Sequence, residues 1–202
     1  MKNNVPKLRF PEFTDAWEQR KLGAECKITM GQSPKSENYT KNPEDFILVQ
    51  GNADMENGEV IPRVWTKQIT KLADKGDIIF SVRAPVGEVA RTKYQAVLGR
   101  GVSAIKGNEF IFQLLHLIKL RRQWEKLSTG STFDSIGSDI LKDFIFSRPT
   151  LPEQQKIGSF FRQLDSLITL HQYKYFAHFS RPKYCHFCLK RKEGTSPPTY
   201  PA

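Results

Sequence analysis

The stretch Gly76-Asp-Ile-Ile-Phe-Ser-Val-Arg-Ala-Pro-Val-Gly87 decides the fold class of this chain. Its part from Asp77 to Arg83 is rich in β-branched and aromatic residues, which predicts a strand that ends at Ala84-Pro85. Asn57-Gly58 upstream is a turn signal between short segments. Further short strands are expected on both sides, at residues 46–50, 88–91, 95–98 and 102–105. The middle of the chain is therefore rich in strands.

Two helices are expected after this strand-rich part. Residues 109–128 carry apolar side chains at helical spacing: Ile111, Leu114, Leu115, Ile118, Trp124 and Leu127. A second helix is expected to begin near Pro152, because proline is favoured in the first turn and Glu153 suits the positive end of the helix dipole.

The second helix carries an apolar stripe with the spacing of three and four residues that is typical of a coiled-coil seam. The stripe consists of Ile157, Phe160, Phe161, Leu164, Leu167 and Ile168. It weakens after Ile168, and Pro182 ends any helix. Such a stripe either packs onto its own domain or pairs with another helix.

These elements predict an α/β (α+β) fold, in which a strand-rich domain with packed helices precedes a projecting helix of the coiled-coil type. An extended lead-in is expected over residues 1–16, where Pro6 and Pro11 forbid a regular helix. The domain is expected over 17–150 and the start of the helix over 151–172. Residues 173–202 mix Tyr, Phe, His, Cys and Pro and are expected to form a disordered tail.

Composition excludes several classes of protein. The 202 residues are 39% hydrophobic and 26% charged, as in an ordinary globular protein. The longest apolar run, from Phe110 to Leu120, is broken by polar residues and is too short to span a membrane. The start of the chain lacks the apolar segment of a signal peptide. Three cysteines are too few for a disulfide scaffold and suit a reducing cytoplasm.

The charge of the chain points to a polyanionic partner. Its formal net charge is +10, and nucleic acid is the first partner that such a balance suggests. Residues 173–202 contain six Lys or Arg and one Glu, so they carry +5, and residues 1–172 carry the other +5. A solubilising surface is the alternative explanation.

The segment Gly99-Arg-Gly101-Val-Ser-Ala104 matches G-x-G-x-x-A, a pattern of dinucleotide-binding folds. In those folds a helix opens at the glycines so that its amides face pyrophosphate. Here the following residues are β-prone, which favours a tight turn between strands.

Two other patterns raise the question of a metal site. Glu12, Glu25 and Lys27 loosely fit the carboxylates and lysine of a small Mg²⁺-dependent nuclease. Cys185 and Cys188 form one C-x-x-C pair, which His178 or His186 would have to complete as a zinc site. Both patterns are short, and no Ser-His-Asp or Cys-His constellation is evident. The prediction is a chain with no catalytic centre and no metal of its own.

Six segments, in this order, resemble the specificity (S) subunit of type I restriction–modification systems. They are Val5-Pro-Lys-Leu-Arg-Phe-Pro-Glu-Phe13 with Trp17-Glu-Gln-Arg-Lys-Leu-Gly23, Thr29-Met-Gly-Gln-Ser-Pro34, residues 76–87, Thr129-Gly-Ser-Thr-Phe133 with Ile136 and Leu141, Leu151-Pro-Glu-Gln-Gln-Lys-Ile-Gly158, and Leu164-Asp-Ser-Leu-Ile168. The resemblance covers about residues 5–172.

The resemblance implies a DNA target-recognition domain followed by a conserved spacer helix. A typical member has two such domains and does no chemistry. It docks methyltransferase subunits and, in the full complex, restriction and translocase subunits. S-adenosylmethionine, ATP and Mg²⁺ would be bound by those partners, and double-stranded DNA by the recognition domains.

This chain departs from the family pattern in two ways. It has one recognition domain, which implies a half-subunit that pairs with a second copy through the helix and reads a split, inverted-repeat target. Its composition also changes abruptly near residue 172, which suggests a truncated or frame-shifted gene. The alternative is therefore an inactive remnant, or a decoy that binds the methyltransferase without productive DNA reading.

Polar residues in loops between strands are the candidates for DNA contacts. Lys and Arg would bind phosphates, while a few polar side chains would bind base edges. Each candidate has an ordinary surface or turn role as its alternative. The candidates are Gln32, Ser33, Lys35, Gln50, Asn52, Arg83, Lys93, Arg100, Ser131 and Thr132.

Overall fold

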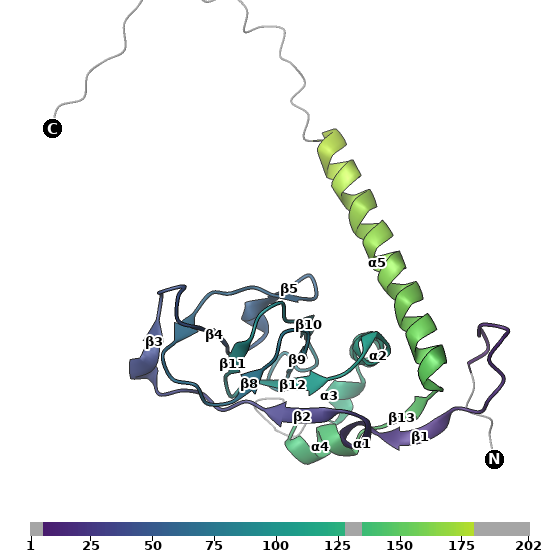
Figure 1. The fold of residues 1–202 in the computed structure, drawn as a ribbon, viewed down its shortest axis with the longest axis horizontal. Helices are drawn as coiled ribbons and strands as arrows, with labels where there is room; N and C mark the ends of the chain where they lie inside the picture. Colours follow the sequence, from purple (N-terminus) through teal and green to yellow (C-terminus); the bar gives the residue numbers. More distant parts are fainter. Residues whose placement is uncertain (1–5, 128–134, 180–202) are drawn as a thin grey trace, which may run out of the picture. The chain divides into compact units, whose positions relative to one another are not determined.

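The computed structural model describes residues 6–127 and 135–179. The chain divides into two compact units, residues 1–162 and 163–202. All sheets of the described chain lie in the first unit, which is a mixed α/β domain, and the described part of the second unit is the remainder of the last helix (Figure 1). The expected fold class is thereby confirmed.

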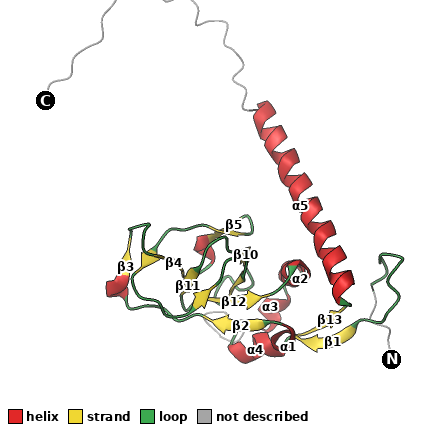
Figure 2. Ribbon diagram, viewed as in Figure 1, coloured by secondary structure: helices red, strands yellow, loops and turns green. Residues whose placement is uncertain are grey.

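The strands form three sheets (Figure 2). A six-stranded sheet has the order β2 (Lys27–Met30), β12 (Val102–Lys106), β9 (Ile78–Ser81), β10 (Val89–Arg91), β6 (Glu59–Val60) and β5 (Met55–Glu56). A five-stranded sheet has the order β3 (Tyr39–Thr40), β7 (Trp65–Thr66), β4 (Phe46–Val49), β11 (Ala96–Leu98) and β8 (Leu72–Ala73). The strands β1 (Glu18–Lys21) and β13 (Ile145–Arg148) form an antiparallel pair.

Helical segments connect and cover these sheets. They are α1 (Leu22–Glu25), the 3-10 turns η1 (Ser36–Asn38) and η2 (Asn52–Asp54), α2 (Glu109–Leu120), α3 (Gln123–Leu127), α4 (Ser138–Asp143) and α5 (Leu151–Phe179).

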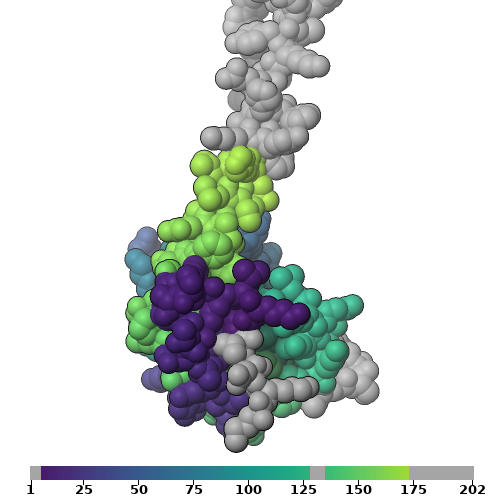
Figure 3. Space-filling view, turned by 90° about the vertical axis from the view of Figure 1, so that its right-hand side faces the viewer, coloured from purple at the N-terminus to yellow at the C-terminus, as the bar shows by residue number. Residues whose placement is uncertain are grey.

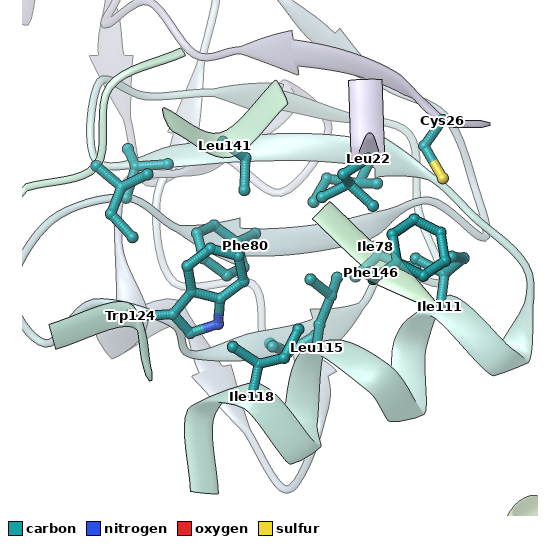
Figure 4. Close-up of a cluster of buried hydrophobic side chains, with 14 of the residues drawn as sticks. Leu22, Cys26, Ile78, Phe80, Ile111, Leu115, Ile118, Trp124, Leu141 and Phe146 are labelled. Atoms are coloured by element: carbon teal, nitrogen blue, oxygen red, sulfur yellow. The ribbon is translucent and has the colours of Figure 1, made fainter. Parts of the chain in front are cut away.

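Strand β9 lies at the centre of the core because it is buried on both faces. Successive side chains of a strand point to opposite faces, so Ile78 and Phe80 join one apolar cluster and Ile79 joins another. Figure 4 shows the first cluster, in which Phe80 meets Trp124 edge to face at 5.0 Å between ring centroids. Burial on both faces explains the continuous apolar run that predicts this strand from sequence.

The expectation of a single helix over residues 109–128 is wrong, because the structure has two helices there, α2 and α3. The break is at Arg122, whose φ of 54° lies in the left-handed region. Ile118 and Trp124 are six residues apart, which in an unbroken helix would turn them about 120° away from each other. The break lets both side chains enter the same core.

Helix α5 begins at Leu151, close to the expected start, and its first turns are held by the lead-in segment. Glu153 is fully buried and accepts hydrogen bonds from the Arg9 guanidinium at 2.6 and 2.7 Å and from the Trp17 indole at 3.2 Å. Lys156 pairs with Glu12 and lies over the ring of Phe10. Figure 3 shows the lead-in against the beginning of α5.

The apolar stripe of α5 is divided between two environments. Ile157 packs against the core of its own domain. Phe160 contacts Phe10 edge to face at 6.0 Å and remains 46% exposed. The other stripe residues are 37–56% exposed: Phe161, Leu164, Leu167 and Ile168.

The helical backbone of α5 continues to Phe179. The expectation of a disordered tail from Tyr173 onward is therefore wrong for residues 173–179, and the rest of that tail lies outside the described residues. Among the described residues, no helix has the length and apolar content that crossing a membrane requires.

Candidate nucleic-acid interface

Several chain segments meet where strands β4 and β11 end. The two strands are parallel, with Leu48 opposite Val97, so their carboxyl ends lie at the same edge. Strand β9 also ends there, since the amide of Val82 donates to the carbonyl of Gly101 at 2.9 Å. The loops that follow these three strands are therefore brought together, although they are separated in sequence.

Two glycines allow the backbones to approach closely at this edge. A Cβ on Gly101 would lie 2.2 Å from the carbonyl oxygen of Gln50, and one on Gly31 would lie 2.0 Å from that of Gly99. Both distances are too short for any side chain. The glycines of the G-x-G pattern thus allow the loop between β11 and β12 to pass close to the backbone of Gln50. Strand β12 follows the pattern, whereas a dinucleotide site requires a helix there.

Hydrogen bonds fix the backbone of the loops around this crossing. The buried carboxylate of Asp54 accepts from the amides of Gln50 at 2.7 Å and Gly51 at 3.3 Å. The amide of Arg100 donates to the hydroxyl oxygen of Ser33 at 3.0 Å. These hydrogen bonds hold the backbone of the loops in place.

The loops enclose a pocket of about 260 Å³, which we call the loop-edge pocket. Its lining residues are Ser33, Gln50, Gly51, Asn52, Ser81, Arg83, Ala84, Arg100 and Gly101. Five residues predicted from sequence as DNA contacts are among them: Ser33, Gln50, Asn52, Arg83 and Arg100. The lining includes no carboxylate. Neither arginine forms an ion pair with a residue that the structure describes.

Three of the other predicted contacts lie elsewhere in the described structure. Gln32 is next to the pocket, and its carbonyl accepts from the hydroxyl of Thr70 at 2.6 Å. Lys35 is paired with Glu37 at 3.8 Å on the surface. Lys93 precedes β11, so it lies at the opposite end of that strand from Arg100.

Lys93 is therefore not brought together with the pocket. Its ammonium group donates to Glu59 at 2.6 Å, and this hydrogen bond raises the pKa of Lys93. Lys106 at the same end is paired with Asp74. Lys93 and Lys106 are thus neutralised within the domain, whereas the two arginines of the loop-edge pocket are not.

Ser131 and Thr132 lie outside the described residues. The described chain resumes at Ser135, which forms an antiparallel bridge with Arg83. Sequence reasoning missed Ser81, which also lines the pocket. The signal for it was a lone polar residue at the end of a buried apolar strand.

The structure does not support the metal-nuclease alternative. Glu12 is paired with Lys156, and Glu25 with Arg148 at 3.1 Å, so the two carboxylates serve separate ion pairs. No three His, Cys, Asp or Glu side chains are grouped as a metal site within residues 6–127 and 135–172. Cys26, between Glu25 and Lys27, is buried, and burial raises the pKa of its thiol to about 11. Cys185, His186 and Cys188 lie outside the described residues.

Comparison with known proteins settles the family. Residues 14–175 match the family described as "Type I restriction modification DNA specificity domain". The chain belongs to this family. As the resemblance in the sequence implies, specificity subunits are non-catalytic components of restriction–modification complexes and bind no cofactor themselves.

Two specificity subunits from Methanocaldococcus jannaschii are similar to the chain. The candidate MjaX specificity subunit of a type I restriction enzyme is 35% identical over 172 residues, which are 81% of this chain and 40% of that protein. The MjaIX specificity subunit is 29% identical over 103 residues, which are 48% of this chain and 24% of that protein. The chain thus spans less than half of either relative.

Solved structures of type I restriction–modification proteins have the same fold. A chain from a study of complex assembly and conformational transition in the type I R-M system has a TM-score of 0.69 and 28% identity, covering 87% of this chain and 45% of that one. The HsdS subunit of Thermoanaerobacter tengcongensis has a TM-score of 0.67 and 27% identity, covering 84% of this chain and 41% of that one.

Proposed function

We propose that this chain is a DNA-reading half of a type I specificity subunit. It would direct adenine methylation and restriction by partner subunits to a defined target. One observation carries the proposal: the strand topology brings five polar residues from four separate loops into the loop-edge pocket. Family membership supports it independently.

The charge distribution favours a polyanion at this edge. Arg83 and Arg100 have no internal counter-ion among the described residues, whereas Lys93 and Lys106 at the opposite end are paired. Guanidinium groups bind both phosphate oxygens and base edges. The chain itself would do no chemistry, so S-adenosylmethionine, ATP and Mg²⁺ would be bound by the methyltransferase and restriction subunits.

The half-subunit proposal rests on helix α5. Residues 14–175 match one specificity domain, and the chain spans 40% of its MjaX relative. Four exposed apolar side chains on α5 need a partner: Phe161, Leu164, Leu167 and Ile168. A second copy would supply it, and a two-fold dimer would read an inverted repeat. Such a complex would act on chromosomal DNA in the cytoplasm.

DNA binding by the full chain in complex with a type I methyltransferase subunit tests the proposal. Changing Arg83→Gln and Arg100→Gln together removes both unneutralised charges and is expected to weaken binding to target DNA at least tenfold. Lys93→Gln, at the opposite end of β11, is the matched control and is expected to leave binding unchanged. Equal affinity of the double variant and the wild-type chain would refute the site.

A further inference from the structure

We infer that the loop-edge pocket receives the major-groove edge of the target's bases and that Arg100 is its guanine-reading residue. The inference rests on the proposed function and specifies its chemistry. The alternative role for Arg100 is a phosphate contact, which would supply affinity without sequence information.

The hydrogen-bonding capacity of the pocket favours bases over phosphate. The side chains of Gln50, Asn52, Arg83 and Arg100 form no hydrogen bond with any residue that the structure describes. The two guanidinium groups only donate, but each amide both donates and accepts. A phosphate offers acceptors alone and would leave the amide oxygens without partners. Base edges present donors and acceptors side by side, so they satisfy the whole set.

The backbone of Arg100 is fixed where this residue lines the loop-edge pocket. Its amide is bonded to Ser33, and the next residue, Gly101, is pressed against the carbonyl of Gln50. Little backbone entropy remains to be lost when the guanidinium binds, because the main chain is already ordered. The planar fork of arginine matches the O6 and N7 acceptors of guanine with two parallel hydrogen bonds.

Gln50 lies close to Arg100, since a Cβ on the neighbouring Gly101 would meet the carbonyl of Gln50. Its amide matches the N7 acceptor and N6 donor of adenine. A pocket that places an arginine beside a glutamine is therefore suited to a guanine next to an adenine. The first requirement of the inference is that the recognised half-site contains a guanine.

The substitutions Arg100→Lys and Arg100→Gln separate base reading from phosphate binding. Lysine keeps the charge and loses the planar fork, whereas glutamine loses both. The full chain, in complex with the methyltransferase subunit, would be titrated with one duplex that carries the target motif of the complex. It would also be titrated with a set of duplexes that each carry one base-pair change in one half-site of that motif. Binding would be measured over a series of salt concentrations.

If Arg100 reads a guanine, both substitutions lower the preference for one G·C pair by about 10- to 100-fold and leave the other positions unchanged. Arg100→Lys then keeps the wild-type salt dependence, and Lys93→Gln keeps the wild-type preference at every position.

Two results would overturn the inference. One is a half-site without guanine. The other is a uniform loss of affinity over all duplexes in Arg100→Gln, with a salt slope reduced by about one and near-normal binding by Arg100→Lys. Failure of the proposed function is a different result, because the wild-type complex would then prefer no sequence at all.

Discussion

Adding one methyl group at Gly101 is expected to destabilise the domain and to disturb the loop-edge pocket. The new Cβ would lie 2.2 Å from the carbonyl oxygen of Gln50, which belongs to the backbone and cannot rotate away. A Cβ makes ordinary van der Waals contacts from about 3.4 Å. The residues after β4 and the β11–β12 loop would therefore have to move apart by about 1 Å. Overpacking of this kind costs about 1–3 kcal/mol of the free energy of unfolding.

For a domain of this size, such a loss lowers the melting temperature by about 2–12 °C. Gly51→Ala is the matched control, since Gly51 lines the same pocket and a Cβ there meets nothing within 4 Å. Its backbone is extended, with φ −175° and ψ −166°, so alanine fits without strain. Thermal unfolding followed by circular dichroism compares the two variants. Equal melting temperatures for Gly101→Ala and Gly51→Ala would refute the close approach of the two loops.

Two further predictions concern other parts of the chain. Because burial raises the pKa of the Cys26 thiol from 9.0 to about 11, a Cys185→Ser, Cys188→Ser variant at pH 8 should react with a thiol reagent at least about a hundredfold more slowly when folded than in denaturant. The rate should rise toward pH 11, and a fast reaction of the folded variant at pH 8 would contradict the buried position. Phe160→Glu with Leu164→Glu, both exposed on α5, should abolish pairing or docking in sedimentation measurements, while the far-ultraviolet circular dichroism stays that of the wild-type chain. Normal assembly of this variant with the methyltransferase subunit would exclude α5 as the contact.

Sequence patterns predict the central strands well because local burial determines them. Strand β9 is apolar from Ile78 to Phe80 since it is buried on both faces, and β4, β11 and β12 share this property in part. The break between α2 and α3 escapes such reasoning. The residues around Arg122 have no glycine or proline to mark an end, and only the position of Trp124 in the core requires the turn.

The candidate site could likewise be predicted only in part, because some of its features depend on contacts between distant segments. Glycines and polar residues after strands indicate loops, and the parallel pairing of β4 with β11 brings five of the predicted residues together. Lys93 was expected among them, but its partner Glu59 is 34 residues away in sequence. The division of the α5 stripe likewise depends on tertiary contacts, because Ile157 meets the core of its own domain and Leu164 is exposed. Pairings over such separations are not visible in local spacing.

Mapping of N6-methyladenine in cells that co-express the full chain with a type I methyltransferase subunit tests the central claim most directly. We predict new methylation at a split, symmetric motif, and loss or relaxation of that motif when Arg83 and Arg100 are both changed to Gln. Absence of new methylation, with the chain folded and bound to the methyltransferase, would contradict this prediction and identify the chain as an inactive remnant or a decoy.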